Sequence, residues 1–386
     1  MNIQLDPAKL PSVTFSCGPG QGHPVIRQTP LYKTLFERSH RAPDVSTRGL
    51  YHETAENLRT LLSLPTGYTV LFFLGGATPA MDAVIWNLTK DSLSGLAFGA
   101  FSRRWTHNIA ARLENSVRRA IREAGENEFF PCDKPDYNAS LIVLTPNETS
   151  TGVQIPDDYL RETWAKRGQD TLIAWDCTSC AGGRVLPAGQ FDVMLFSLQK
   201  CFGAGGGSCA LVLSPKAVSR LEEAKKYHPI PFSLDLSEAV RHAASAQTAN
   251  TPCTTNIWMC NEACKWMLAN GGLPAMEHLC REHADYLLAW AAQTDYIAPL
   301  IKDARLRSFT TLTLEITDPD VKDADISAAL ISTGLANLAD GLKKYSSVKQ
   351  NSLRISCFPF VDVHGVEEYK KLTAAVDEIV RQLKKR

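Results

Sequence analysis

Short, uninterrupted apolar runs separated by longer amphipathic stretches dominate the chain between residues 70 and 213. The runs lack the polar alternation of half-exposed strands, and this is typical of parallel strands buried on both faces of a sheet. The stretches between them have the spacing of helices that cover such faces. The pattern predicts an α/β fold with a doubly wound sheet. We expect strands at 70–74, 95–98, 141–144, 172–175, 194–197 and 210–213, and helices at 79–88 and 105–124.

The chain changes character after Gly271-Gly272, which stops a predicted helix at 256–270. Beyond this point, predicted helices at 275–294, 325–331 and 366–384 are mixed with predicted strands at 309–315 and 353–356. These elements predict a smaller α+β domain. We therefore expect a large α/β domain at 19–272 and a small domain formed by 1–18 and 273–386.

Charge and composition exclude several classes of protein. The formal net charge is zero, so the chain has no global attraction to nucleic acid. No stretch approaches the ~18 apolar residues of a membrane span, and residues 1–12 do not resemble a signal peptide. We expect a cytoplasmic protein. Its eleven scattered cysteines suit reduced thiols better than a disulfide framework.

Polar and glycine residues follow the predicted strands at the points where ligands gather in an open parallel sheet. Each has a simple structural explanation when taken alone, such as a turn for the glycines, a helix N-cap for Asp176 or a solvated side chain for Lys200. Their occurrence in order at successive strand ends indicates one site instead. They are Gly75-Gly76-Ala77-Thr78, Asn147-Glu148-Thr149, Asp176-Cys177-Thr178-Ser179 and Gln199-Lys200, the last followed by glycines at 203 and 205–207.

These residue types match the requirements of pyridoxal-phosphate chemistry. A lysine must form a Schiff base with the cofactor and move a proton, which Lys200 can do. A carboxylate must pair with the pyridinium nitrogen, and an aromatic ring should stack on the cofactor, roles that Asp176 and Trp105 can fill. Gly75-Gly76 followed by a helix can bind the phosphate through backbone N–H groups. Thr149 can hydrogen-bond the ring hydroxyl.

Several motifs, in order over nearly the whole chain, resemble the phosphoserine aminotransferases, a class-V family of fold-type-I (aspartate-aminotransferase-like) enzymes that depend on pyridoxal 5'-phosphate. The resemblance implies that the large domain binds the cofactor and that Asn250 and Thr251 make the enzyme a homodimer with shared sites. The matching segments are 15–20, Ser39-His40-Arg41, 58–62, Pro146-Asn147-Glu148-Thr149, Gln199-Lys200, Asn250-Thr251-Pro252 and Leu353-Arg354-Ile355-Ser356.

The resemblance also implies a role for each matched residue. Lys200 and Asp176 would be the catalytic pair, and Arg354 would hold the substrate α-carboxylate. His40 and Arg41 would bind the substrate's distal anion. The remaining residues would contact the cofactor, with Ala77 using its backbone only and Asn250 and Thr251 reaching the phosphate of the neighbouring subunit. These cofactor residues are Gly76, Ala77, Trp105, Thr149, Thr178, Gln199, Asn250 and Thr251.

The implied activity is ping-pong transamination between phosphoserine and 2-oxoglutarate, a step of serine biosynthesis. Ala77 departs from the family, which typically has an arginine there, and the cation could come from Arg48, Arg103, Arg104 or Lys349. Alternatives are an aminotransferase with another acidic or small amino donor, and a pyridoxal-phosphate lyase or desulfurase. We expect no metal, because the cysteine pairs 177/180 and 260/264 lie far apart without ribbon-like composition.

Overall fold

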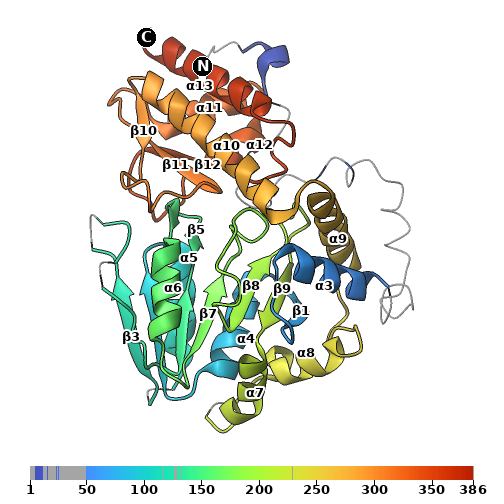
Figure 1. The fold of residues 1–386 in the computed structure, drawn as a ribbon. Helices are drawn as coiled ribbons and strands as arrows, with labels where there is room; N and C mark the ends of the chain where they lie inside the picture. The colour runs from blue at the N-terminus through green and yellow to red at the C-terminus, as the bar shows by residue number, and fades with distance from the viewer. Residues whose placement is uncertain are drawn as a thin grey trace.

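The computed structural model describes residues 5–11, 15, 23, 25, 49–114, 116–125, 128–131, 133–227 and 229–385. A seven-stranded sheet forms the centre of the larger part of the molecule, with strand order β1-β9-β8-β7-β4-β2-β3 (Figure 1). The strands are β1 (Thr69–Leu74), β2 (Ser92–Ala97), β3 (Arg118–Glu123), β4 (Leu141–Leu144), β7 (Leu172–Asp176), β8 (Val193–Ser197) and β9 (Ser208–Leu213).

Helices cover both faces of this sheet, which explains why its strands lack polar alternation. Along β1, Leu71 and Phe73 pack into one core, whereas Val70 and Phe72 pack into the core on the opposite face. The prediction of a doubly wound α/β fold is therefore confirmed. The first core contains residues of α4 (Ala77–Leu88), α7 (Pro215–Ala224) and α8 (Leu236–Ala243), and the second contains residues of α3 (Leu50–Leu61), α6 (Asp157–Lys166) and α9 (Thr254–Ala269).

Strand β9 is antiparallel to both of its neighbours, β8 and β1, whereas β2, β3, β4, β7 and β8 form a parallel set. The prediction of a wholly parallel sheet is wrong at this strand. Residues 198–207, which connect β8 to β9, contain no helix. A parallel return needs a longer crossover, usually a helix, so this short glycine-rich connection reverses the chain.

The predicted helix at 105–124 is also wrong. The helical segment is shorter and begins earlier, and residues 118–123 form the edge strand β3. Among the described strands it pairs with β2 alone, and its charged side chains are largely exposed. Charges are typical of a strand that must not pair with other molecules, and they gave this segment a helix-like pattern. The helical elements are α5 (Ala100–Arg103), the π-helix η2 (Arg104–Ile109) and the short 3-10 helix η3 (Ala110–Arg112).

A three-stranded antiparallel sheet with its own core forms the smaller part, above α5 and β5 in Figure 1. Phe15 packs in this core, 4.9 Å from Tyr369 between ring centroids. The predicted division at residue 272 falls at the start of α10 and stays a prediction. The elements are η1 (Pro7–Lys9), β10 (Ile297–Pro299), β11 (Thr311–Ile316), β12 (Ser352–Ser356), α10 (Gly272–Gln293), α11 (Asp323–Ser332), α12 (Ala336–Leu342) and α13 (Glu367–Leu383).

The two parts meet at the hairpin formed by β5 (Asn147–Glu148) and β6 (Val153–Gln154). Val153 bridges to Arg307, and a Cβ atom on Gly152 would lie 2.9 Å from Thr313 Oγ1. This close approach places the hairpin after β4 directly beneath the small sheet. No helix in the described part of the chain has the length and apolar character needed to span a membrane.

Candidate active site

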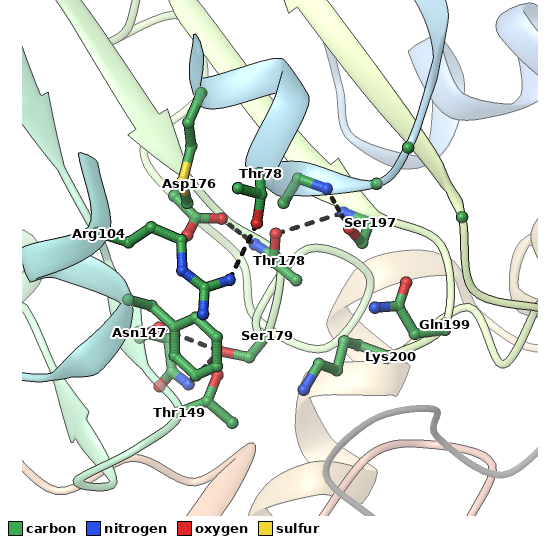
Figure 2. A pocket seen from close by; sticks show the side chains of 16 residues that line it. Thr78, Arg104, Asn147, Thr149, Asp176, Thr178, Ser179, Ser197, Gln199 and Lys200 are labelled. Carbon is green, nitrogen blue, oxygen red and sulfur yellow. Dashed lines mark hydrogen bonds between the residues drawn. The ribbon is translucent and has the colours of Figure 1, made fainter. Parts of the chain in front are cut away.

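A cavity of about 290 Å³ opens where β1, β4, β7 and β8 end (Figure 2). Its wall brings together most of the residues that the strand ends suggested, although they come from widely separated segments. Those in the wall are Gly76, Ala77, Thr149, Asp176, Thr178, Gln199 and Lys200. The wall also contains Gly75, Thr78, Met81, Phe101, Arg104, Asn147, Ser179, Ser197 and Gly207.

The turn between β1 and α4 forms one end of the cavity. Gly76, at a φ of +77°, is the N-cap of α4 and has no side chain, so no side-chain cap blocks an anion at this helix start. The N–H of Ala77 donates to Ser197 Oγ at 2.7 Å, and the N–H of Ser197 donates to Thr178 Oγ1 at 3.3 Å. Hydroxyl groups and a helix start thus converge on one point, as a phosphate requires.

Ser197 is a site residue that the sequence analysis missed. It is the last residue of β8, and a Cβ atom on Gly76 would lie 3.3 Å from its Oγ. The signal that could have found it is its position, because Asp176 occupies the same last place on the neighbouring strand β7.

Asp176 is buried at the end of β7, and it accepts a hydrogen bond from the N–H of Thr178 at 3.0 Å. Burial raises the pKa of the Asp176 carboxyl to about 6, and the nearby Glu148 adds to the rise. The hydrogen bonds from Thr178 and the charge of Lys200 oppose the shift. Because burial disfavours the charged form of this carboxylate, a cationic ligand beside Asp176 would be stabilising.

Lys200 is 8% exposed in the connection between β8 and β9. Figure 2 shows its amino group directed into the cavity, toward Thr149 and Ser179. Ser179 is held in place because Asn147 Nδ2 donates to its hydroxyl at 2.8 Å. The neighbouring Gln199 has a buried Oε1 with no hydrogen-bond partner among the described residues. Polar groups of the wall therefore face a lysine that solvent barely reaches.

Phe101 is the aromatic side chain among the described residues of the cavity wall, whereas Trp105, to which the sequence assigned the stacking role, does not line the cavity. Trp105 is fully buried in the core beneath the sheet, among residues of α4. Because the helical segment begins at Ala100, Phe101 lies in its first turn beside the strand ends. Trp105 lies one turn later, within the π-helix, and faces the core.

Glu148 holds Phe101 in place. Its buried carboxylate accepts hydrogen bonds from the N–H groups of Phe101 at 3.1 Å and Ser102 at 2.7 Å. A Cβ atom on Gly99 would lie 2.3 Å from Glu148 Cγ, so only glycine permits this approach. The carboxylate thus caps the start of α5 and fixes the direction in which the phenyl ring leaves the helix.

Arg354 does not line the cavity. It lies on β12, with its guanidinium carbon 5.6 Å from the ring of Tyr345 and its buried Nε without a partner among the described residues. Asn250 and Thr251 are exposed and line a different cavity of about 200 Å³. His40 and Arg41 lie outside the described residues. The part of the chain that the structure describes has no cluster of three or more potential metal ligands.

Comparisons with known proteins agree on one family. The family model described as aminotransferase class-V matches residues 25–368. The chain is 33% identical to a phosphoserine aminotransferase of Corynebacterium glutamicum, over 95% of this chain and 94% of that protein. It is 34% identical to a putative phosphoserine aminotransferase of Mycobacterium avium, over 96% and 95% of the two chains.

Solved structures are similar over nearly the whole chain. A phosphoserine aminotransferase from Cytophaga hutchinsonii has a TM-score of 0.82 at 26% identity, covering 95% of this chain and 98% of that one. A ureidoglycine-glyoxylate aminotransferase from Bacillus subtilis has a TM-score of 0.77 at 17% identity, covering 100% and 95%. The second likeness concerns the fold alone, which is the fold of type-I pyridoxal-phosphate enzymes.

Proposed function

This chain belongs to the class-V aminotransferases, pyridoxal-phosphate transaminases of fold type I, and we propose that it transfers an amino group between phosphoserine and 2-oxoglutarate, a reaction of serine biosynthesis. The names of full-length relatives at 33% and 34% identity support this substrate. The observation that carries the proposal is the buried Lys200 in one cavity with Asp176 and the start of α4.

The residues of the cavity fit pyridoxal phosphate. Gly76 and Ser197 leave room and donors for a phosphate at the start of α4, and the raised pKa of Asp176 suits a carboxylate that receives a cation. Phe101 offers a ring face, and Thr149 offers a hydroxyl group near the lysine. When bound, the cofactor supplies an aldehyde for the donor's amino group and a ring that accepts electrons from the donor's α-carbon.

Each residue then has a defined task. Lys200 would bind the cofactor covalently and later move the proton taken from the donor's α-carbon. Asp176 would keep the pyridine nitrogen protonated, and Thr149 would contact the ring hydroxyl. The phosphate would be held by Thr178, Gln199 and the backbone of Gly76 and Ala77. Phe101 takes the stacking role that the sequence assigned to Trp105. The low exposure of Lys200 limits access of water to the reacting atoms.

The substrate contacts are proposals of the same kind. Arg354 would hold the α-carboxylate and orient the bond that breaks. Its partnerless buried Nε supports a ligand contact, and a ring contact links its neighbour Tyr345 to Phe101. His40 and Arg41 would bind the distal anion.

Further proposals concern the assembly and its surroundings. Asn250 and Thr251 are exposed outside the cavity, which supports contact with the neighbouring subunit of a homodimer. Light scattering of the purified protein tests the dimer. The separate core around Phe15 supports a small domain of residues 1–18 and 273–386. We propose the cytoplasm as the compartment, supported by the scattered cysteines of the described residues, which form no disulfide with one another.

The comparisons do not favour the alternatives. The relatives from Corynebacterium glutamicum and Mycobacterium avium and the structure from Cytophaga hutchinsonii carry phosphoserine aminotransferase names, which describe transaminases and not lyases or desulfurases. Cys357, a candidate for desulfurase chemistry, is fully buried after β12.

A half-reaction screen tests the proposed donor. The purified holoenzyme is mixed with phosphoserine, glutamate, serine, alanine or aspartate, and conversion of the cofactor from its aldehyde to its amine form is followed by absorbance. We expect phosphoserine to react with the highest kcat/KM. A higher value for aspartate or alanine would contradict the proposal.

A further inference from the structure

The guanidinium group of Arg104 lies in the cavity wall, and the roles proposed above do not use it. Arg104 begins the π-helix η2 and lines the cavity with Thr78 and Phe101. Among the described lining residues, Arg104 and Lys200 are the cations and Asp176 is the anion. Because Lys200 is committed to the cofactor, Arg104 is the wall cation left for another ligand.

Two contacts fix the direction of this side chain. Nη1 of Arg104 donates to Thr78 Oγ1 at 2.9 Å, and its guanidinium carbon lies 5.1 Å from the centroid of the Phe101 ring. Figure 2 shows the guanidinium in the cavity between the labelled Thr78 and Asn147 side chains. Neither contact neutralises the charge, and no described carboxylate lies within 4.0 Å of its nitrogen atoms. The remaining N–H donors are therefore available to an anion.

The other candidate cations are placed differently. Arg103 is exposed, pairs with Glu123 at 3.0 Å and lines a separate cavity together with Lys349. Arg48 lies outside the described residues. Ala77 lines the active-site cavity but ends at Cβ, and the Thr78 hydroxyl beside it holds Arg104. Of the described candidates, Arg104 is thus the one that reaches the active site.

We propose that Arg104 is a specificity-determining residue that binds the distal anionic group of the amino donor. It would supply the charge that an arginine at position 77 provides in the family that this sequence resembles. The inference rests on the proposed function in that it requires a donor with two anionic ends. A guanidinium presents parallel N–H groups to a phosphate or a carboxylate, and partial burial weakens screening by salt.

The test compares three variants with the wild type as holoenzymes. Arg104→Gln removes the charge, Arg104→Lys keeps the charge without the fork, and Arg103→Gln is the control one residue away. Single-turnover half-reactions are measured with phosphoserine and with alanine, which has no distal anion. We expect Arg104→Gln to lower kcat/KM for phosphoserine about 10- to 100-fold, mainly through KM, and for alanine less than about threefold. Arg104→Lys should lie between, and Arg103→Gln should match the wild type.

An equal loss with both donors, or no loss with phosphoserine, would overturn the inference. The dissociation constant of pyridoxal phosphate for each variant provides a second readout. If Arg104→Gln raises the dissociation constant of the cofactor by the same factor as it lowers kcat/KM for phosphoserine, Arg104 binds the cofactor and the inference is wrong. If the wild type prefers aspartate to phosphoserine, the proposed substrate fails, but the aspartate-to-alanine ratio still decides the role of Arg104.

Discussion

The ring centroids of Phe101 and Tyr345 lie 5.3 Å apart, at an interplanar angle of 58°. Phe101 belongs to the active-site wall, whereas Tyr345 precedes strand β12 and lies beneath the guanidinium of Arg354. This contact joins the cavity at the large sheet to the arginine on the small sheet. It gives the proposed α-carboxylate site a physical connection to the proposed cofactor site.

Arg354→Gln should therefore impair every amino donor. All donors carry an α-carboxylate, and loss of a charged hydrogen-bonding partner costs about 1.5–3 kcal/mol. We expect KM to rise about 10-fold or more with both alanine and phosphoserine in half-reaction kinetics. A selective effect on phosphoserine would instead assign Arg354 to the distal anion and contradict the proposed α-carboxylate role.

Phe101→Leu and Trp105→Leu should separate ligand contact from core packing. Phe101→Leu should weaken pyridoxal-phosphate binding several-fold, because ring stacking contributes about 0.5–1.5 kcal/mol, and should change thermal stability little. Trp105→Leu should lower the free energy of unfolding by a few kcal/mol, since it opens a cavity in a closed core. Cofactor titration and thermal unfolding measure the two effects, and the reverse assignment would restore Trp105 as the stacking residue.

Asp176→Asn should change how the stability of the cofactor-free protein depends on pH. Burial raises the pKa of Asp176 to about 6 from an ordinary value of 3.8, so the folded chain keeps a proton that the unfolded chain has lost. The stabilisation is complete below about pH 4 and is lost as the pH rises through about 6. As the pH rises between these limits, the free energy of unfolding of the wild type should fall by up to about 3 kcal/mol relative to that of the Asn variant.

Pyridoxal phosphate provides the control for this experiment. A cation beside Asp176 favours the charged carboxylate, so saturation with the cofactor should remove the loss in the wild type. Thermal unfolding at several pH values, with and without cofactor, measures both curves. Parallel curves for wild type and variant without cofactor would show that the Asp176 pKa is not raised.

Ser197→Ala should weaken the phosphate site selectively. The hydroxyl group supports the start of α4 at Ala77, and its loss removes one polar group from the proposed cradle. We expect the dissociation constant of pyridoxal phosphate to rise about 10-fold. Pyridoxal, which lacks the phosphate, is the matched ligand, and its affinity should stay within about twofold. An equal loss for both ligands would place Ser197 away from the phosphate.

Much of the fold could be predicted because burial on both faces leaves a clear pattern. Residues 70–73 send alternate side chains into two different cores, which requires apolar residues throughout. The sequence also indicated Asp176, Lys200 and Gly76. Each lies at or just after the end of a buried apolar run, and the ends of these runs meet at the edge of the sheet where ligands bind. The direction of β9 depends on the shape of a loop, which no apolar pattern records.

The error at Trp105 has a similar physical origin. Phe101 and Trp105 lie one turn apart on the short helical segment that follows β2. If the start of this segment is placed one turn too late, Trp105 is assigned to the cavity and Phe101 is overlooked. The change from α-helix to π-helix at Arg104 has no recognisable pattern in the amino-acid sequence. Gly99, which follows β2 after Phe98, was the usable signal, since it is the N-cap of the helix.

The covalent attachment of pyridoxal phosphate at position 200 is the central claim. Purified wild type and Lys200→Ala are incubated with the cofactor, reduced with borohydride, digested and analysed by mass spectrometry. We expect a phosphopyridoxyl group on the peptide that contains Lys200 in the wild type, and no such group on any peptide of the variant. A folded wild-type protein modified at another lysine, or at none, would contradict it.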